Sequence, residues 1–213
     1  VATGQPALTR ALNIQKTVAK MGFDWNDTRA VILKIREELD EVQQAINETP
    51  DTIQEELGEN FDVIFPKMPN AQNARYLEWN IWFENIVPLL DNDIIILGHS
   101  LGGLFIIKYL AENNFPKKIK ALLLVGTPYN TPTQHPLVDF VITTPLDNVV
   151  TQVKKIYIYH SKDDQVVQFR NAQDYLKELP GAQLREFTDK GHFNSETFPE
   201  IIEDIKVITN ELI

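Results

Sequence analysis

The chain has 213 residues, of which 43% are apolar and 9% aromatic, and its formal charge at pH 7 is −10. This composition is typical of a packed globular protein and excludes an intrinsically disordered one. The acidic excess is spread along the chain without a basic patch, so we expect neither nucleic acid nor a membrane surface as a partner. There is no cysteine, which excludes disulfides, thiolate nucleophiles and Cys-ligated metals.

Targeting and membrane signals are absent from the sequence as given. No apolar run reaches the roughly 18 residues that a membrane-spanning helix requires. The first residues lack the charged-then-apolar pattern of a signal peptide. We therefore expect a soluble, cytoplasmic protein.

The first sixty residues carry a helical pattern. Apolar side chains recur at spacings of three and four over residues 8–21 and again over residues 28–46, which is the period of amphipathic helices. Thr49-Pro50-Asp51 interrupts the second helix, and a third is expected to begin over residues 52–59. This segment is predicted to be an α-helical hairpin followed by the start of a third helix.

From Phe61 onward, short apolar runs alternate with amphipathic helical segments. Continuous apolar runs such as residues 94–97 and 121–125 are typical of parallel strands covered on both faces. We expect strands at residues 61–65, 93–97, 120–125, 154–160 and 183–187, and helices at residues 74–90, 101–113, 171–179 and 199–213. This alternation predicts an α/β fold, a mostly parallel sheet of about five strands with helices on both faces.

The most specific motif is Gly98-His99-Ser100-Leu101-Gly102, between the apolar run 94–97 and a helical segment. A G-x-S-x-G motif in this context places the serine on a tight turn with its hydroxyl exposed, and the flanking glycines permit that turn. The backbone N–H of Leu101, at the start of the helix, then points to where an oxyanion would develop. Ser100 is therefore the candidate nucleophile and Leu101 the candidate oxyanion donor.

A serine hydroxyl needs an adjacent base, and His192 has the appropriate setting, after the last predicted strand and before the terminal helix. The remaining histidines are expected in structural or surface positions: His99, His135 and His160. The orienting acid should lie between serine and histidine in chain order. Asp163 and Asp164 both follow the strand over residues 154–160, and spacing alone does not choose between them.

Four segments make the C-terminal two-thirds similar to a known family. They are Pro66-Lys67-Met68-Pro69-Asn70, the run from Tyr76 to Phe83 (YLEWNIWF), the serine motif and Gly191-His192-Phe193. Together they resemble the small α/β-hydrolases of the retinoblastoma-binding-protein-nine type over roughly residues 61–213.

This resemblance implies a serine hydrolase that cleaves ester or related acyl bonds of a small-molecule substrate and needs no cofactor. It also implies a triad of Ser100, His192 and Asp164, because in such proteins the acid precedes an x-hydrophobic-hydrophobic turn. Asp163 remains the alternative acid.

The sequence departs from this family at one point. Such proteins begin with a strand and a glycine-containing loop that supplies the second oxyanion donor, and nothing upstream of Phe61 has that pattern. In the family's sheet, that strand lies between the strands corresponding to residues 61–65 and 93–97. If it is missing, residues 61–65 pair directly with the nucleophile strand, or a partner chain fills the gap. Loss of one oxyanion donor lowers the rate on the order of 100- to 1,000-fold, so we expect weak activity in that case.

Two acidic pairs lie in the helical N-terminal segment, Glu38 with Glu41 and Glu56 with Glu59. A spacing of three places both members of a pair on one helix face, so two such helices side by side would gather four carboxylates. Such a cluster either binds a hard cation such as Mg²⁺ or consists of two solvated helix faces. Spacing alone leaves both interpretations open.

The acidic pairs, together with residues 11–16 (ALNIQK) and 22–25 (GFDW), resemble the MazG-type nucleoside triphosphate pyrophosphohydrolases, which are all-helical Mg²⁺ enzymes. The resemblance implies that the four glutamates are metal ligands, although the family usually has Asp at the position of Glu59. It covers roughly residues 7–60, about half of such a domain. Members commonly work as dimers or tetramers.

The sequence thus predicts a chimera of two family fragments joined near Asn60, a MazG-like segment over residues 1–60 and a truncated α/β-hydrolase over residues 61–213. The leading hypothesis is a serine hydrolase. One alternative is a Mg²⁺-dependent nucleoside triphosphate pyrophosphohydrolase, and the other is a non-catalytic chain that oligomerises. A homo-oligomer is expected.

Overall fold

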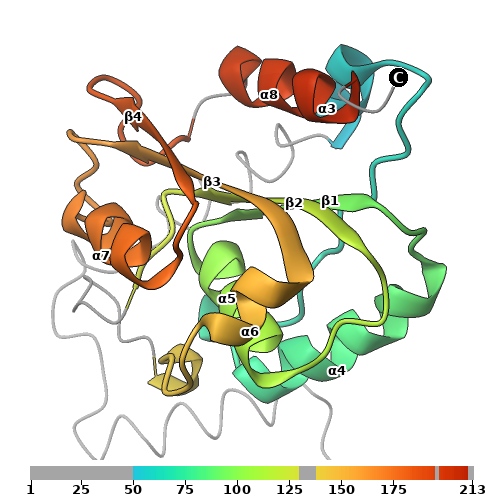
Figure 1. Ribbon diagram of the computed structural model, residues 1–213, viewed down its shortest axis with the longest axis horizontal. Coiled ribbons are helices and arrows are strands. Elements are labelled where there is room, and N and C mark those ends of the chain that lie inside the picture. Colours follow the sequence, from blue (N-terminus) through green and yellow to red (C-terminus); the bar gives the residue numbers. More distant parts are fainter. Residues whose placement is uncertain (1–49, 130–137, 195–196, 211–213) are drawn as a thin grey trace, which may run out of the picture. The chain divides into compact units, whose positions relative to one another are not determined.

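Four parallel strands form the centre of the computed structural model, which describes residues 50–129, 138–194 and 197–210 (Figure 1). Their order in the sheet follows the chain: β1 (Ile94–His99), β2 (Ile119–Val125), β3 (Val153–Ser161) and β4 (Gln183–Phe187). Each neighbouring pair is parallel. The carboxyl ends of all four strands therefore lie at one edge of the sheet, where α/β proteins place their ligand sites.

Helices cover both faces of this sheet, as Figure 1 shows. One face carries α4 (Tyr76–Ile86), α5 (Leu101–Glu112), α6 (Asp147–Gln152) and α7 (Arg170–Glu178). The other face carries α3 (Pro50–Leu57) and α8 (Pro199–Asn210). Short 3-10 turns lie at Ala71–Asn73, Val87–Leu89 and Val138–Phe140. This is the predicted α/β architecture with helices on both faces.

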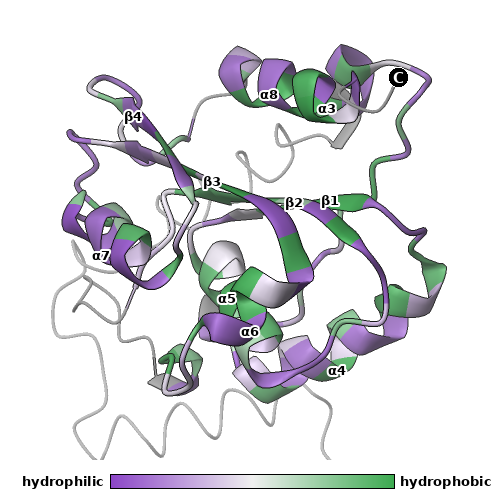
Figure 2. Ribbon diagram, in the orientation of Figure 1, coloured by the Kyte–Doolittle hydropathy of each residue, from purple (hydrophilic) through white to green (hydrophobic). Residues whose placement is uncertain are grey.

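The central strand β2 is apolar at successive positions because both of its faces are covered. Leu122 and Leu124 of β2 point into the core beneath α5, while Leu123 and Val125 point toward α8. All four side chains are buried. Figure 2 shows the contrast with α7, which is mainly hydrophilic and buries only a narrow stripe against β3 and β4.

The helix that follows β1 is the most deeply buried one in the described part of the chain. Nine residues of α5 are buried, because this helix lies between the sheet and α4. Trp79 and Phe83 of α4 meet Phe105 of α5 edge to face, with ring centroids 5.6 and 5.5 Å apart. Such pairs contribute about 0.5–1.5 kcal/mol beyond the area that they bury. They fix the helix that begins at Ser100.

Residues 61–65 do not form the strand that the sequence predicts, and the sheet has four strands in the described residues instead of about five. The side chain of Gln54 takes up the backbone groups that a neighbouring strand would use. Its Nε2 donates to the carbonyl of Phe61 at 2.6 Å, and its Oε1 accepts from the N–H of Val63 at 3.0 Å. Of the two alternatives for a missing central strand, direct pairing of residues 61–65 with β1 is therefore wrong, and a partner chain in the gap stays a prediction. No described strand lies on the outer side of β1.

The other boundaries differ less from prediction. The third helix runs over Pro50–Leu57 and ends before Gly58, whose φ of +84° stops it, so Glu59 lies beyond the helix. The helix expected over residues 74–90 is α4 followed by a 3-10 turn, and the six-residue α6 was not predicted. The predicted hairpin over residues 8–46 lies outside the described residues, and the domain boundary near Asn60 stays a prediction.

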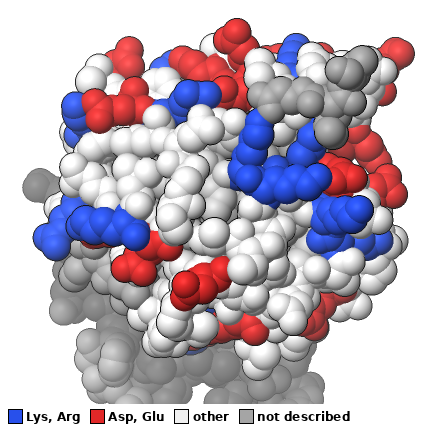
Figure 3. Space-filling view, in the orientation of Figure 1, with Lys and Arg blue, Asp and Glu red and all other residues white. Residues whose placement is uncertain are grey.

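Charges of both signs are interspersed on the face shown in Figure 3, around a broad neutral area. A mixed surface of this kind produces no strong field of a single sign. None of the helices in the described ranges is long and apolar enough to cross a bilayer.

A half-buried ionic contact joins α8 to the sheet. Arg185 of β4 donates two hydrogen bonds to Asp204 of α8, both at 2.9 Å, and the hydroxyl of Tyr159 on β3 donates to the same carboxylate at 2.7 Å. Burial raises the pKa of Tyr159, and the hydrogen bond to Asp204 raises it further. The phenol therefore stays protonated and keeps its role as a donor.

We expect Asp204→Ala to lower the free energy of unfolding by about 1–3 kcal/mol, since it leaves the buried Tyr159 hydroxyl without its partner. The matched control is Glu203→Ala, an exposed acid one position earlier on α8, which should change stability by less than about 0.5 kcal/mol. Urea unfolding followed by circular dichroism measures both. Equal effects of the two substitutions would contradict this role of Asp204.

Candidate active site

Ser100 lies at the turn where β1 ends and α5 begins. Its backbone has φ 50° and ψ −122°, a conformation that a residue with a Cβ adopts only under strain. Three backbone hydrogen bonds hold it there. Its N–H donates to the carbonyl of Val125 on β2 at 2.8 Å, and its carbonyl accepts from Gly103 and Leu104 at 3.0 and 3.3 Å. The turn therefore presents the Ser100 side chain at the carboxyl edge of the sheet.

Two glycines allow β1, α5 and the end of β2 to meet at this turn. A Cβ on Gly98 would lie 2.6 Å from the Cα of Gly103, and a Cβ on Gly103 would lie 2.1 Å from Oγ1 of Thr127. Neither position admits a side chain. A Cβ on Gly102, by contrast, would meet no described atom within 4 Å. The prediction that the turn requires the glycines flanking Ser100 is therefore confirmed for Gly98 but not for Gly102. The close contact at Gly103 was not predicted.

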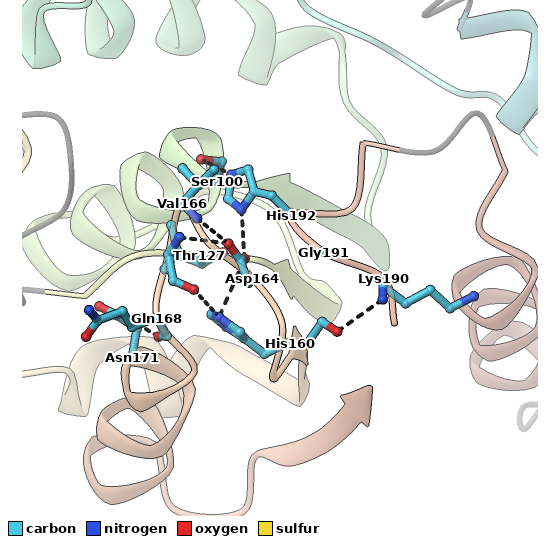
Figure 4. Close-up of polar contacts among 12 residues, drawn as sticks. Ser100, Thr127, His160, Asp164, Val166, Gln168, Asn171, Lys190, Gly191 and His192 are labelled. Atoms are coloured by element: carbon cyan, nitrogen blue, oxygen red, sulfur yellow. Dashed lines mark hydrogen bonds and ion pairs between the residues drawn. The ribbon is translucent and has the colours of Figure 1, made fainter. Parts of the chain in front are cut away.

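The loops after β3 and β4 bring Asp164 and His192 to the serine, as Figure 4 shows. Nε2 of His192 lies 3.0 Å from Oγ of Ser100, and Nδ1 of His192 lies 2.8 Å from Oδ2 of Asp164. A carboxylate can only accept, so Nδ1 carries the proton and Nε2 is free to accept from the serine hydroxyl. The structure thus brings three of the predicted site residues together in one chain of hydrogen bonds.

The carboxylate of Asp164 is buried and fully bonded. Oδ1 accepts from the N–H groups of Val166 and Val167, both at 2.8 Å, while Oδ2 faces His192. Burial would raise the pKa of Asp164, but the hydrogen bonds from His192 and these two amides outweigh it, and the pKa lies below its ordinary value. Asp164 is therefore ionised at neutral pH.

The imidazole of His192 lies against a glycine that the sequence reasoning missed. Gly126 follows β2 with φ +50°, and its N–H donates to the carbonyl of Tyr159 at 2.9 Å. A Cβ on Gly126 would lie 3.2 Å from Cε1 and Nδ1 of His192 and 3.5 Å from Oδ2 of Asp164. Gly126 could have been predicted from its place directly after an apolar strand, since that strand ends at the same edge of the sheet as the serine motif.

The alternative acid, Asp163, is bonded to groups other than the imidazole. Its Oδ1 accepts from the N–H of Gly191 at 3.0 Å and from the hydroxyl of Ser161. These partners separate the two carboxylates that spacing could not separate. Asp163 therefore contacts the backbone before His192, and Asp164 contacts its ring.

The remaining histidines fall in different places. His160 is fully buried and its Nε2 donates to the carbonyl of Val167 at 2.8 Å. Burial lowers the pKa of His160, so the ring is neutral. His99, expected in a structural role, donates from Nε2 to the carbonyl of His192 at 2.8 Å. His135 lies outside the described residues.

Leu101, whose N–H is the predicted oxyanion donor, follows Ser100 directly in the chain. Leu101 is the first residue of α5, so its N–H has no acceptor within the helix. The family's second donor belongs to a loop and strand on the outer side of β1, and the described ranges contain no strand there.

The acidic pairs are only partly within the described residues. Glu38 and Glu41 lie outside them. Glu56 is half-buried on α3, and Glu59 is exposed beyond the end of that helix. The expectation that Glu56 and Glu59 share a helix face is therefore wrong. No group of three acidic or histidine side chains suited to a metal occurs in the described ranges, and because Glu38 and Glu41 lie outside them, the Mg²⁺ site stays a prediction.

Known proteins match different parts of the chain. The serine hydrolase RBBP9 of Rattus norvegicus is 27% identical over 149 residues, which are 68% of this chain and 77% of that protein. The crystal structure of the ydeN gene product from Bacillus subtilis superposes with a TM-score of 0.59 at 21% identity, over 68% of this chain and 80% of that one, which shows a shared fold. The nucleoside triphosphate pyrophosphohydrolase/pyrophosphatase MazG of Thermotoga maritima is 43% identical over 54 residues, 25% of this chain and 20% of that protein.

A family model described as serine hydrolase matches residues 53–206. This range takes in the sheet, the serine turn and the loops that carry Asp164 and His192. It also includes most of α3, whose Leu57 is buried against the same sheet. Since the match covers well over half of the sequence, the chain belongs to the serine hydrolase family.

Proposed function

We propose that this protein hydrolyses ester or related acyl bonds of a small-molecule substrate, with Ser100 as nucleophile, His192 as general base and Asp164 as the residue that orients the base. The observation that carries this proposal is the continuous hydrogen-bond chain from Asp164 through both nitrogens of His192 to Ser100. Membership of the serine hydrolase family and the strained turn at Ser100 also support it.

In the proposed reaction, Nε2 of His192 takes the proton of the Ser100 hydroxyl as Oγ attacks the carbonyl carbon. His192 then gives that proton to the leaving group, and an acyl group remains on Ser100. A water molecule, activated by the same histidine, releases the acid and regenerates the serine. Asp164 keeps the proton on Nδ1 and stabilises the imidazolium that forms in each step.

The N–H of Leu101 is the proposed donor to the oxyanion at each tetrahedral stage. Since this donor belongs to the serine turn itself, its position follows from the contacts that hold Ser100. With one donor in place of two, we expect a rate on the order of 100- to 1,000-fold below that of a complete oxyanion hole. The proposal is therefore of a slow hydrolase.

The match to MazG favours a second candidate, release of pyrophosphate from nucleoside triphosphates with Mg²⁺ and the carboxylates of Glu38, Glu41, Glu56 and Glu59. It extends over only 20% of that protein, and Glu56 and Glu59 lack the expected shared helix face. The serine hydrolase is therefore the better-supported function. Pyrophosphate release that depends on Mg²⁺, disappears in Glu38→Ala and persists in Ser100→Ala would support the second candidate.

We expect a fluorophosphonate probe to label the folded protein at Ser100, because His192 activates that hydroxyl. Ser100→Ala should abolish labelling. Thr151→Ala, which removes an exposed hydroxyl on α6, should leave it unchanged. Gel fluorescence and peptide mass mapping measure the outcome. Folded wild-type protein that takes up no probe, or Ser100→Ala protein that is still labelled, would refute the proposed nucleophile.

Gly126→Ala should lower kcat by about 10- to 100-fold, because the new Cβ, 3.2 Å from the imidazole of His192, displaces that ring by a few tenths of an ångström, and a displacement of about 1 Å lowers the rate about 100-fold. Gly181→Ala is the matched control. Gly181 also has a positive φ, +87°, but a Cβ there would meet no described atom within 4 Å. Both variants should lose comparable stability through backbone strain, while only Gly126→Ala should lose activity. Similar kcat values for the two variants would contradict the packing role of Gly126.

The lowered pKa of Asp164 predicts a pH dependence of stability. The unfolded carboxyl titrates near its ordinary value, about 3.9, and the folded one below it, so the ionised form stabilises the native state above that pH. This contribution is lost as the pH falls through the folded pKa. The difference in unfolding free energy between wild type and Asp164→Asn should therefore not decrease from about pH 7 to 5 and should shrink below about pH 4. Urea titrations across this range test it, and a difference that already shrinks between about pH 7 and 5 would be inconsistent with a depressed pKa.

A further inference from the structure

The backbone that leads into His192 is bonded to side chains at three points. We call residues 190–192 the histidine loop. Its first N–H donates to Oγ of Ser161 at 3.1 Å, and its second N–H donates to Oδ1 of Asp163 at 3.0 Å. Its last carbonyl accepts from Nε2 of His99 at 2.8 Å. Figure 4 shows the course of the loop from Lys190 through Gly191 to His192, with the first of these bonds drawn at Lys190.

The chemistry of these bonds is mutually consistent. The Ser161 hydroxyl donates a hydrogen bond to Asp163 and accepts one from the N–H of Lys190. This buried side chain therefore links the carboxylate to the first amide of the loop. His99 bonds a carbonyl, which can only accept, so its Nε2 carries the proton. None of the three side chains contacts the ring of His192 through a hydrogen bond. Ser161 and Asp163 bond to the backbone of the loop, while the ring of His99 also packs against that of His192, with ring centroids 4.9 Å apart.

The histidine loop ends against a strained residue. Gly191 has φ +52°, which a glycine adopts freely. Phe193, directly after the loop, has φ +57°, which a residue with a side chain adopts only when its surroundings impose it. On the far side, the buried ring of Phe193 packs between those of Phe187 and Phe198, with centroids 5.6 and 6.1 Å away. On the near side, the bonds from Ser161, Asp163 and His99 add to a turn hydrogen bond from the N–H of Phe193 to the carbonyl of Lys190 at 3.0 Å.

The three side chains also tie the loop to the other members of the proposed triad. His99 precedes Ser100 in the chain, and Asp163 precedes Asp164. If the serine turn or the Asp164 turn moved, His99 or Asp163 would move with it, and the histidine loop bonded to that side chain would be displaced as well. The distances from His192 to Ser100 and to Asp164 therefore depend on the backbone bonds of the loop as well as on the hydrogen bonds of the ring.

We propose that Ser161, Asp163 and His99 are positioning residues that hold the histidine loop so that His192 lies within hydrogen-bond distance of Ser100 and Asp164. This proposal rests on the proposed function, since it assigns the loop the task of placing a general base. It gives Asp163 a role distinct from that of Asp164: Asp163 supplies an acceptor for the Gly191 amide, while Asp164 supplies a negative charge for the imidazole.

The difference between these roles makes the test specific. An Asn at 163 keeps a carbonyl oxygen that can accept from Gly191, so Asp163→Asn should retain most of the wild-type kcat. Asp163→Ala removes the acceptor and should lower kcat by about 10- to 100-fold with KM little changed, because a displacement of the base impairs the chemical step. Ser161→Ala should act in the same direction. Asp189→Asn and Asp189→Ala are matched controls, because Asp189 is exposed beside the loop. Both controls should keep the wild-type kcat and KM.

Two readouts are measured on each variant, the rate of fluorophosphonate labelling at Ser100 and the hydrogen exchange of the Gly191 amide by NMR. We expect Asp163→Ala to label more slowly and to exchange faster at Gly191 while its melting temperature stays close to that of the Asp189 controls. If Asp163→Ala does not fold, Ser161→Ala and the Lys190 amide provide the same comparison.

Failure of this proposal is distinguishable from failure of the proposed function. Wild-type protein that is folded but unlabelled would refute the function, and Gly191 exchange would then still report whether Asp163 holds the loop. Exchange that is unchanged in Asp163→Ala, or a labelling rate equal to that of the controls, would overturn the positioning role. Loss of activity in Asp163→Asn as severe as in Asp164→Asn would also overturn it, because it would mean that the charge matters and not the acceptor.

Discussion

The backbone of Ser100 is held in a strained conformation by the close approach of three chain segments. β1, α5 and the end of β2 meet at Gly98, Gly103 and Thr127, at distances that leave no space for a Cβ on either glycine. The hydrogen bond from the Ser100 N–H to the carbonyl of Val125 closes the contact. Without this contact, the Ser100 hydroxyl would not face His192, and the Leu101 amide would not lie next to that hydroxyl. The buried helix α5, fixed by the aromatic rings of α4, keeps this approach in place.

The parallel order of the strands is sufficient to bring the other groups of the site to the serine turn. Each strand ends at the same edge, so the loops after β2, β3 and β4 deliver Gly126, Asp164 and His192 to the serine turn. The ring of His192 has a bond on each nitrogen and a glycine against its face. Its backbone has the further bonds from Ser161, Asp163 and His99. The base is therefore restrained through both its ring and its backbone, as pre-organised sites require.

The sequence predicted the strands near residues 94–97 and 120–125 from continuous apolar runs, and those near residues 154–160 and 183–187 from shorter apolar runs that alternate with helical segments. The structure confirms all four. The same rule failed at residues 61–65. There, a glutamine side chain satisfies the backbone, and pairing by a side chain nine residues earlier leaves no periodic signal. The helix α6 was missed because six residues are too few to show a period.

Within the site, motif context was sufficient to nominate Ser100, Asp164 and His192, which the structure brings into contact, although their catalytic roles stay a prediction. Spacing could not separate Asp163 from Asp164, since only the fold decides which way each points. Gly103, Gly126 and the bond from His99 depend on distances between segments far apart in the chain, and no local pattern records them. The pairing of Glu56 with Glu59 failed for a local reason, the left-handed Gly58 between them.

The central claim is that Ser100 forms a covalent acyl intermediate. Rapid mixing with an activated ester, followed by acid quenching and peptide mass mapping, tests it most directly. The account predicts a burst of released alcohol that does not exceed the enzyme concentration and a mass increase of one acyl group on the peptide that contains Ser100. Hydrolysis of the ester without a burst and without an adduct, or an adduct on any other residue, would contradict it.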